Sequence, residues 1–174
     1  VRGINVGGRH KVVMEEFCHE LKELGMSNVS SYINSGNFFF DSSLMKVELL
    51  LVLEKFLNKT YPFIKVFSLF TLEDYQNEVA SLPKWWEDDF YRKDVLLYTD
   101  RLDKNETRNV IESLELGDEI IHLGQLGIYW GKFDKSSYNQ TAYHKKLLKA
   151  PFYPSITIRN ARTFSKIGHF LRMK

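Results

Sequence analysis

The chain has 174 residues, of which 44% are hydrophobic, 14% aromatic and 26% charged. This composition is typical of a globular protein and excludes a largely disordered chain, and a chain of this length can bury a core without disulfide or metal staples. The formal net charge of +2 is too small to indicate nucleic-acid binding by charge alone. Cys18 is the single cysteine, so no disulfide can form within the chain, and we expect a protein of the reducing cytoplasm.

The sequence also argues against a membrane protein. The most apolar run, 47–56, is interrupted by Glu48, Glu54 and Lys55, and no signal peptide is recognisable. The chain begins in what reads as the middle of a strand, without a methionine. We therefore expect a few native residues before Val1 and a first strand longer than it appears.

The first half of the chain reads β-α-β-β-α-β-α. Gly25 and Pro83 are placed to end the first and third helices, and Ser35 with Gly36 predicts a hairpin turn. The expected elements, in that order, span residues 1–6, 14–24, 29–34, 37–40, 44–57, 63–69 and 72–82.

The second half repeats this order after a charged, aromatic linker at 84–93. Its expected elements span 94–98, 103–114, 119–123, 126–131, 141–148, 155–159 and 161–171. The β-α-β-β-α-β order is that of the ferredoxin-like unit. We therefore predict an α+β protein of two tandem ferredoxin-like subdomains, 1–83 and 94–174, each an antiparallel sheet with helices packed on one face. A cleft between the two subdomains is the natural place for a ligand.

Polar residues surround a glycine pair near the start of the chain. Arg2 and Asn5 lie in the first strand, Gly7 and Gly8 follow it, and three potentially cationic side chains occupy 9–11, ending with Lys11. Glycines between a strand and a helix are typical of anion sites, although a plain tight turn needs the same residues. The residues after Gly8 match neither a P-loop nor a GxGxxG dinucleotide motif.

Two further polar stretches lie at expected strand ends. Asn34, Ser35 and Asn37 surround the hairpin turn, where turn chemistry alone is also an explanation. Arg159 and Asn160 end the last strand, ahead of Thr163, and Asn160 has the chemistry of an ordinary helix N-cap.

No catalytic residue, metal site or cofactor is predicted. The five histidines lack the spacing of metal ligands, and no GxSxG or cysteine nucleophile motif is present. Tyr129 and Trp130 on an expected strand suggest a nucleic-acid-binding module as a lesser alternative, without the RNP1 pattern. Trp85 and Trp86 are best explained by packing between the halves, and a dimer formed through them is a third possibility.

Three motifs carry a resemblance to a known family. They are RGINVGG at 2–8, followed by Lys11 and Met14; YINSGNFFF at 32–40; and TIRN at 157–160, followed by Thr163. Together they resemble the bacterial family called domain of unknown function 1697, which implies a cytoplasmic protein with a pair of ferredoxin-like subdomains and no established activity. Members often carry Trp-Asn where this chain has Ala161 and Arg162, and Gln where it has Asn34. The last motif therefore carries over only at Arg159, Asn160 and Thr163.

The leading hypothesis is a non-metal, cytoplasmic protein that binds an anionic or phosphorylated small ligand at the cleft between the subdomains. Nucleic-acid binding and dimerisation remain alternatives, and the oligomeric state is left open. The predicted ligand-binding residues are Arg2, Asn5, Gly7, Gly8, Lys11, Asn34, Ser35, Asn37, Arg159, Asn160 and Thr163.

Overall fold

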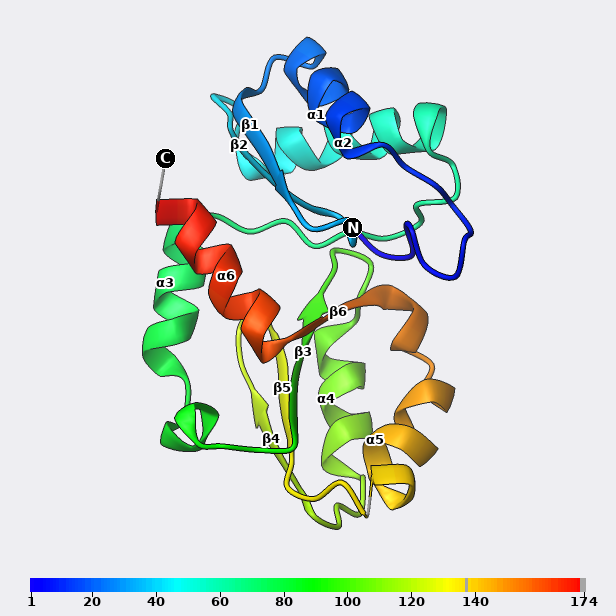
Figure 1. Ribbon diagram of the computed structural model, residues 1–174, viewed down its shortest axis with the longest axis vertical. Coiled ribbons are helices and arrows are strands. Elements are labelled where there is room, and N and C mark those ends of the chain that lie inside the picture. Colours follow the sequence, from blue (N-terminus) through cyan, green and yellow to red (C-terminus); the bar gives the residue numbers. More distant parts are fainter. Residues whose placement is uncertain (137, 173–174) are drawn as a thin grey trace.

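The computed structural model describes residues 1–136 and 138–172 and shows an α+β fold with two antiparallel sheets (Figure 1). Its first half contains α1 (Met14–Glu23), β1 (Ser27–Tyr32), β2 (Asn37–Asp41), α2 (Lys46–Thr60) and α3 (Leu72–Ser81). Its second half contains η1 (Lys84–Glu87), β3 (Arg92–Tyr98), α4 (Lys104–Glu112), β4 (Glu119–Leu123), β5 (Gly127–Lys132), η2 (Tyr138–Gln140), α5 (Ala142–Lys145), η3 (Leu147–Lys149), η4 (Tyr153–Ser155), β6 (Ile156–Asn160) and α6 (Ala161–Arg172).

The second half has the strand order of a ferredoxin-like sheet. Its four strands run β4-β5-β3-β6, and every neighbouring pair is antiparallel. The central strand β3 pairs on one edge with β5 and on the other with β6, so all its backbone groups can be satisfied within the sheet.

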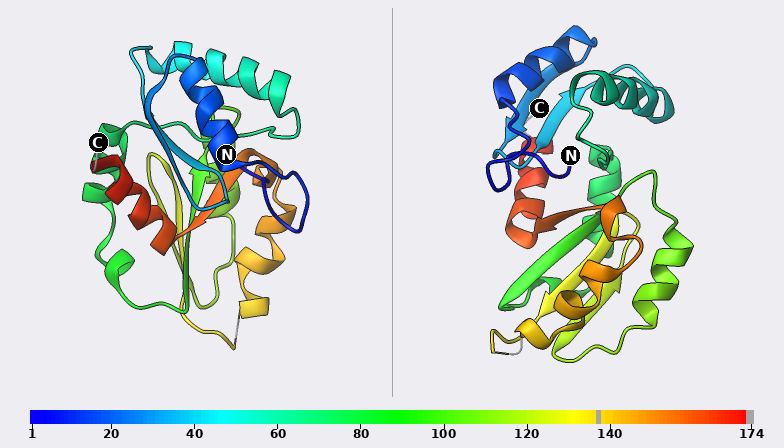
Figure 2. Two further views of the ribbon diagram at one scale, coloured as in Figure 1. Left: turned by 45° about the horizontal axis from the view of Figure 1, so that its top comes forward. Right: turned by 90° about the vertical axis from the view of Figure 1, so that its right-hand side faces the viewer.

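Helices cover both faces of this sheet, which corrects the prediction that helices pack on one face. Leu96 of β3 packs towards α4 and α5, whereas its neighbours Val95 and Leu97 pack towards α3 and α6 (Figures 1 and 2). All three residues are at most 3% exposed. A strand that is apolar at consecutive positions buries both of its faces, and this is the physical reason for the second helical layer.

In the first half, only the hairpin forms a ladder among the described residues. Tyr32 faces Asn37 at its closed end, and α1 and α2 supply an apolar layer. Among the described residues, neither 1–6 nor 63–69 is assigned as a strand, and one backbone bond joins them, from Arg2 N to Val66 O at 3.2 Å. Gly3 and Asn5 have φ angles of 77° and 53°, so the chain bends within 1–6. Those two predictions are wrong for this structure, because the bend at residues 3–5 interrupts the first segment and the second lacks a neighbour that would complete its ladder.

The two halves pack closely through α3 and α6. Tyr75 of α3 donates from its hydroxyl to the carbonyl of Phe164 in α6 at 3.2 Å. The ring of Phe170 lies 4.8 Å from that of Tyr32 and 5.2 Å from that of Phe39. Helix α3 therefore precedes the predicted boundary at Pro83 in sequence but packs on the second half.

Gly168 is needed where α6 crosses α3. A Cβ added at this position would overlap the ring and hydroxyl of Tyr75. We expect Gly168→Ala to lower the free energy of unfolding by about 1–3 kcal/mol through overpacking, although alanine is about 1 kcal/mol better than glycine in an open helix. Urea denaturation measures this change. Ser165→Ala, at an exposed position of the same helix, is the matched control and should change stability by less than about 0.5 kcal/mol. A stabilising Gly168→Ala would contradict the close crossing.

The tryptophan pair packs inside the second half. The Trp86 ring lies edge-on to Tyr129 at 5.0 Å, and the Trp85 ring lies 5.7 Å from that of Phe90.

Within the described residues, none of the helices has the length and apolar character that a bilayer crossing requires.

Candidate functional site

Arg159, near the end of β6, holds the hairpin tip against the second half. Its guanidinium donates to one side-chain oxygen and four backbone carbonyls: Asn37 Oδ1 at 2.6 Å, Ile158 O and Val1 O at 2.9 Å, Ser35 O at 3.1 Å and Gly36 O at 3.3 Å. The side chain is nearly buried, and burial lowers the pKa of Arg159 to about 10, so it stays charged at neutral pH. Its bonding capacity is therefore largely used within the protein.

Asn37 and Asn5 fix the two loops next to Arg159. The Asn37 amide donates to Tyr32 O at 3.1 Å across the hairpin turn. Asn5 accepts from Val12 N at 2.8 Å and donates to Val12 O and Asn34 O, both at 3.0 Å. Asn5 has a φ of 53°, a left-handed conformation that asparagine tolerates. These bonds tie the segment 5–12 to the hairpin tip.

Gly7 and Gly8 form a tight turn between Val6 and Arg9. Their φ angles are 60° and 73°, and Arg9 N donates to Val6 O at 3.1 Å, which is the pattern of a two-residue hairpin turn. A Cβ added at either glycine would meet no heavy atom of the described residues within 4 Å. The turn therefore requires glycine for its backbone angles, and the space outside it is open.

Arg2 is used at another contact between the halves. Its Nη1 donates to Ile156 O at 2.8 Å and also to Tyr153 O, and its guanidinium lies 4.6 Å from the centre of the Tyr153 ring. Lys11 and the Asn34 side chain, in contrast, are exposed to solvent.

The remaining predicted residues lie where β6 joins α6. Asn160 Oδ1 accepts from Thr163 N at 2.8 Å and caps α6, and Thr163 is buried. Figure 1 shows the start of α6 well separated from the loop that contains Gly7. The structure thus brings Arg159, Asn37 and the Ser35 carbonyl into one cluster, keeps Gly7, Gly8 and Lys11 on an exposed loop, and leaves Asn160 and Thr163 at a helix cap.

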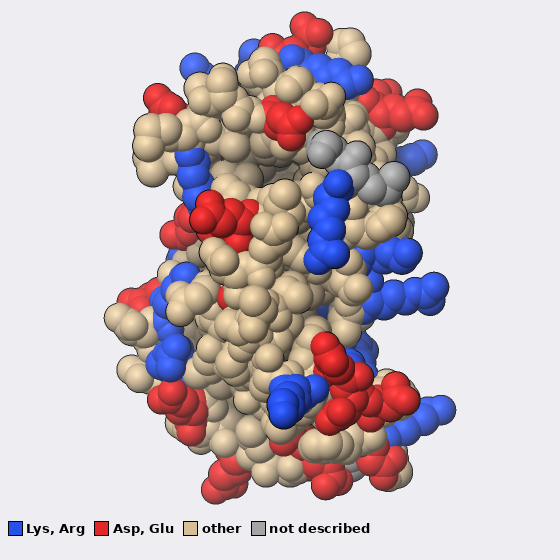
Figure 3. Space-filling view, turned by 90° about the vertical axis from the view of Figure 1, so that its left-hand side faces the viewer, with Lys and Arg blue, Asp and Glu red and all other residues tan. Residues whose placement is uncertain are grey.

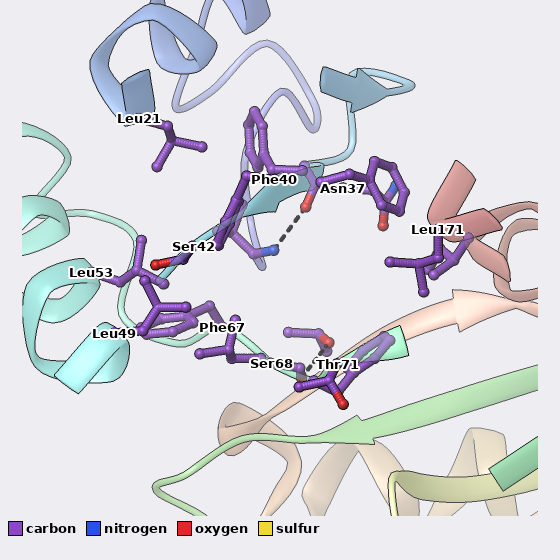
Figure 4. Close-up of a pocket in the computed structure, with 18 of the residues that line it drawn as sticks. Leu21, Asn37, Phe40, Ser42, Leu49, Leu53, Phe67, Ser68, Thr71 and Leu171 are labelled. Atoms are coloured by element: carbon purple, nitrogen blue, oxygen red, sulfur yellow. Dashed lines mark hydrogen bonds between the residues drawn. The ribbon is translucent and has the colours of Figure 1, made fainter. Parts of the chain in front are cut away.

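A cavity of about 510 Å³ lies beside Arg159, between β2, α2, the extended segment 67–71 and α6. Figure 4 shows Phe40 and Phe67 on opposite sides of this hollow, with Leu53 of α2 at one end and Leu171 of α6 at the other. Its polar groups include a pair of hydroxyls, those of Ser68 and Thr157, 3.0 Å apart. These apolar residues were not predicted to line a site, because their only signal in the sequence is the wide apolar surface of α2.

A second charged cluster is buried in the second half. Lys132 Nζ lies 3.0 Å from Asp94 Oδ2, which also accepts from Arg92 Nε at 2.7 Å. Burial lowers the pKa of Lys132, and the neighbouring Asp94 carboxylate partly offsets this effect. None of the three lines the cavity, so we assign them to a structural ion pair.

Several other chemistries find no support. In the described ranges, no three residues among the His, Cys, Asp and Glu side chains gather where they could hold a metal ion. Tyr129 and Trp130 are each 0% exposed, so these rings cannot stack on bases. On the face in Figure 3, charges of both signs are interspersed, with no basic patch of the kind that nucleic-acid binders show.

Known proteins match both the sequence and the fold. The model of the family "Protein of unknown function (DUF1697)" matches residues 1–129. The solved structure of a conserved bacterial protein, SP0830 from Streptococcus pneumoniae, is 57% identical, with a TM-score of 0.96 over 98% of this chain and 95% of that chain. No functionally curated protein matches. The chain therefore belongs to the DUF1697 family of proteins of unknown function.

Proposed function

We propose that this protein binds a small anionic ligand, a phosphate or phosphorylated metabolite, at the Gly7–Gly8 turn. The observation that carries the proposal is the exposed pair of backbone amides in this turn. Across residues 1–136 and 138–172, no hydrogen bond reaches the Gly7 or Gly8 N–H. Because neither residue has a Cβ, an oxyanion can approach both amides closely.

The surroundings of the turn have the charge and rigidity that an anion site needs. Arg9 and Lys11 are exposed, and they supply two positive charges on either side of His10. The His10 ring stacks on Phe63 at 4.7 Å, and Asn5 fixes the other side of the loop through Val12 and Asn34. A loop held in this way loses little conformational freedom when a ligand binds.

Arg2 and Arg159 act as supports for this site. Arg2 and Arg159 bond to carbonyl groups at the contact between the halves, so they position the loop and the hairpin without contacting the ligand. The large cavity is a poor place for a phosphate, because its walls are mostly apolar and Arg159 is already engaged there.

Thermal denaturation with three compounds tests the proposal: inorganic phosphate, adenosine monophosphate and adenosine. A ligand that binds only the folded chain at about 100 times its Kd stabilises it by about 2.7 kcal/mol, which for a chain of this size is a rise in Tm of about 5–10 °C. We expect a rise with the two phosphate compounds and none with adenosine. Equal effects of phosphate and of sodium chloride at the same ionic strength would contradict the proposal.

Charge reversal at the loop gives the matched comparison. The double variant Arg9→Glu with Lys11→Glu should lose the phosphate-dependent rise in Tm, because two exposed cations that follow the turn in the chain become anions. Lys55→Glu with Lys59→Glu makes the same charge change at exposed positions of α2 and should keep the rise. If both double variants lose it equally, the effect comes from overall charge and the assigned site is wrong.

A further inference from the structure

The outer face of α6 carries positive charge along its length. Its exposed residues are Arg162, Ser165, Lys166, His169 and Arg172, and the helix contains no Asp or Glu. Because an α-helix turns by about 100° per residue, the Arg, Lys and His side chains share one side of it, over about 15 Å. We call Arg162, Lys166, His169 and Arg172 the basic face of α6.

The opposite face of α6 fixes this orientation. Phe164 and Ile167 are buried, and they pack in one apolar cluster with Val95 and Leu97 of β3. A rotation that turned the basic face inward would expose these side chains and bury charges, and both changes are costly. The basic face is therefore presented to solvent by a helix that is packed in place.

The charges of the basic face conflict with the local rules of helix stability. Arg162 and Lys166 lie one turn apart, and like charges at this spacing destabilise a helix. Arg162 also lies in the first turn, where the helix dipole favours a negative charge. The first turns of α1, α2, α3 and α4 each contain Glu or Asp, whereas that of α6 contains neither. A departure of this kind from local rules is typical of a functional site.

No neighbouring carboxylate compensates the basic face in the described parts of the chain. None of the ion pairs there includes a residue of α6. Helix α3 packs beside α6, and its exposed residues beyond the first turn, 76–77 and 79–81, are all uncharged. Glu73 and Asp74 lie in that first turn, where Asp74 pairs with Lys46 of α2 at 3.5 Å. The positive potential of α6 is therefore available to a molecule outside the chain.

We propose that the basic face of α6 is a docking site for an acidic helix of a partner protein. Successive cations along it are separated by rises of about 4.5–6 Å. A helix with Glu or Asp at every third or fourth residue has the same rises, so it can place a carboxylate beside each cation. Its charges also relieve the repulsion between Arg162 and Lys166.

The narrow width of the basic face favours a helix over a broader anionic surface. The face is a single row of side chains, and the neighbouring surface of α3 is largely uncharged. The formal net charge of the whole chain is only +2, and the side of the molecule in Figure 3 has charges of both signs. A DNA duplex or an anionic membrane is usually recognised through a larger basic surface.

This inference does not depend on the proposed anion site. The start of α6 is well separated from the loop that contains Gly7 (Figure 1), and the two sites share no residue. Arg9→Glu with Lys11→Glu should therefore leave binding at α6 unchanged, so one idea can fail without the other.

An NMR titration of the ¹⁵N-labelled chain with an acidic peptide tests the inference. The peptide repeats the unit Glu-Ala-Ala-Ala-Glu-Ala-Ala, which puts every glutamate on one side of a helix, and the control peptide has Lys in place of each Glu. We expect saturable shifts of the amides of 162–172 with the acidic peptide alone. Because the contact is between charges, its Kd should rise at least about tenfold between about 20 mM and about 200 mM sodium chloride.

Charge reversal on α6 supplies the matched comparison. Arg162→Glu with Lys166→Glu should abolish the shifts that the acidic peptide causes. It should not lower Tm, because it places a negative charge in the first turn of the helix. Lys55→Glu with Lys59→Glu makes the same change in net charge at exposed positions of α2 and should keep the shifts.

Four outcomes would overturn the inference. The acidic peptide could leave the α6 amides unshifted at low salt, which would mean that the face binds no acidic helix. The two double variants could lose the shifts equally, which would assign binding to net charge. The Lys peptide could bind α6 as tightly as the acidic one, which would exclude charge complementarity. A DNA duplex or phosphatidylserine vesicles could shift the same amides with a Kd at least about tenfold lower at the same salt, which would assign the face to a different partner.

Discussion

Asp94→Ala is expected to lower the free energy of unfolding by about 3–5 kcal/mol, because it leaves the buried ammonium of Lys132 without its carboxylate. Lys132 is 0% exposed, and its Nζ lies 3.0 Å from Asp94 Oδ2. Urea denaturation at neutral pH measures the loss. A change below about 1 kcal/mol would show that the pair is not desolvated as the structure indicates.

A paired replacement separates the charge effect from simple loss of packing. Asp94→Leu combined with Lys132→Met removes both charges, and we expect its stability to lie within about 2 kcal/mol of the parent. The single variant should also depend on pH. Burial lowers the pKa of Lys132 in the folded chain, so the unfolded chain binds more protons and stability rises with pH up to the ordinary lysine range. A destabilisation that grows with rising pH would contradict this account.

Arg159→Met is expected to cost about 3 kcal/mol, because it leaves several acceptors at the contact between the halves without a donor. The carbonyls of Val1 and Ser35 and the side-chain oxygen of Asn37 all depend on this guanidinium. Arg159→Lys keeps the charge but not the planar set of donors, so it should recover less than half of the loss. Chemical denaturation of both variants supplies the measurement.

Arg162→Met on α6 is the control for Arg159→Met, since Arg162 is exposed and its replacement removes the same charge. Its effect should stay within about 0.5 kcal/mol. Similar losses in the two variants would mean that net charge, and not the bonds to the hairpin tip, sets the stability.

Hydrophobic periodicity was enough to predict the α+β class and the order of most elements. It did not predict that helices cover both faces of the second sheet, although Val95, Leu96 and Leu97 carry that signal as a continuous apolar run. The packing of α3 on α6 could not be predicted, because the complementary surfaces of Tyr75 and Gly168 form only in the folded chain. The missing ladder at 63–69 has the same cause, since pairing depends on a neighbour.

The hydrogen-bond partners of the polar motifs could not be inferred from residue type. Arg159 and Arg2 have the chemistry of anion ligands, yet both bind backbone carbonyls. Every residue has a backbone carbonyl, so the sequence does not indicate which carbonyls an arginine will bind. Asn160 behaves as the helix cap that its type suggests. The backbone angles of the turn explain why glycine occupies positions 7 and 8. The exposed amides of the same turn are the basis of the proposed anion site.

The most direct test of that proposal is an NMR titration of the ¹⁵N-labelled chain with inorganic phosphate, followed at individual backbone amides. The account predicts saturable shifts at Gly7, Gly8 and Arg9, with no comparable change at the exposed amides of α2. Gly7 and Gly8 signals that stay in place while phosphate raises Tm, or shifts of equal size along α2, would contradict it.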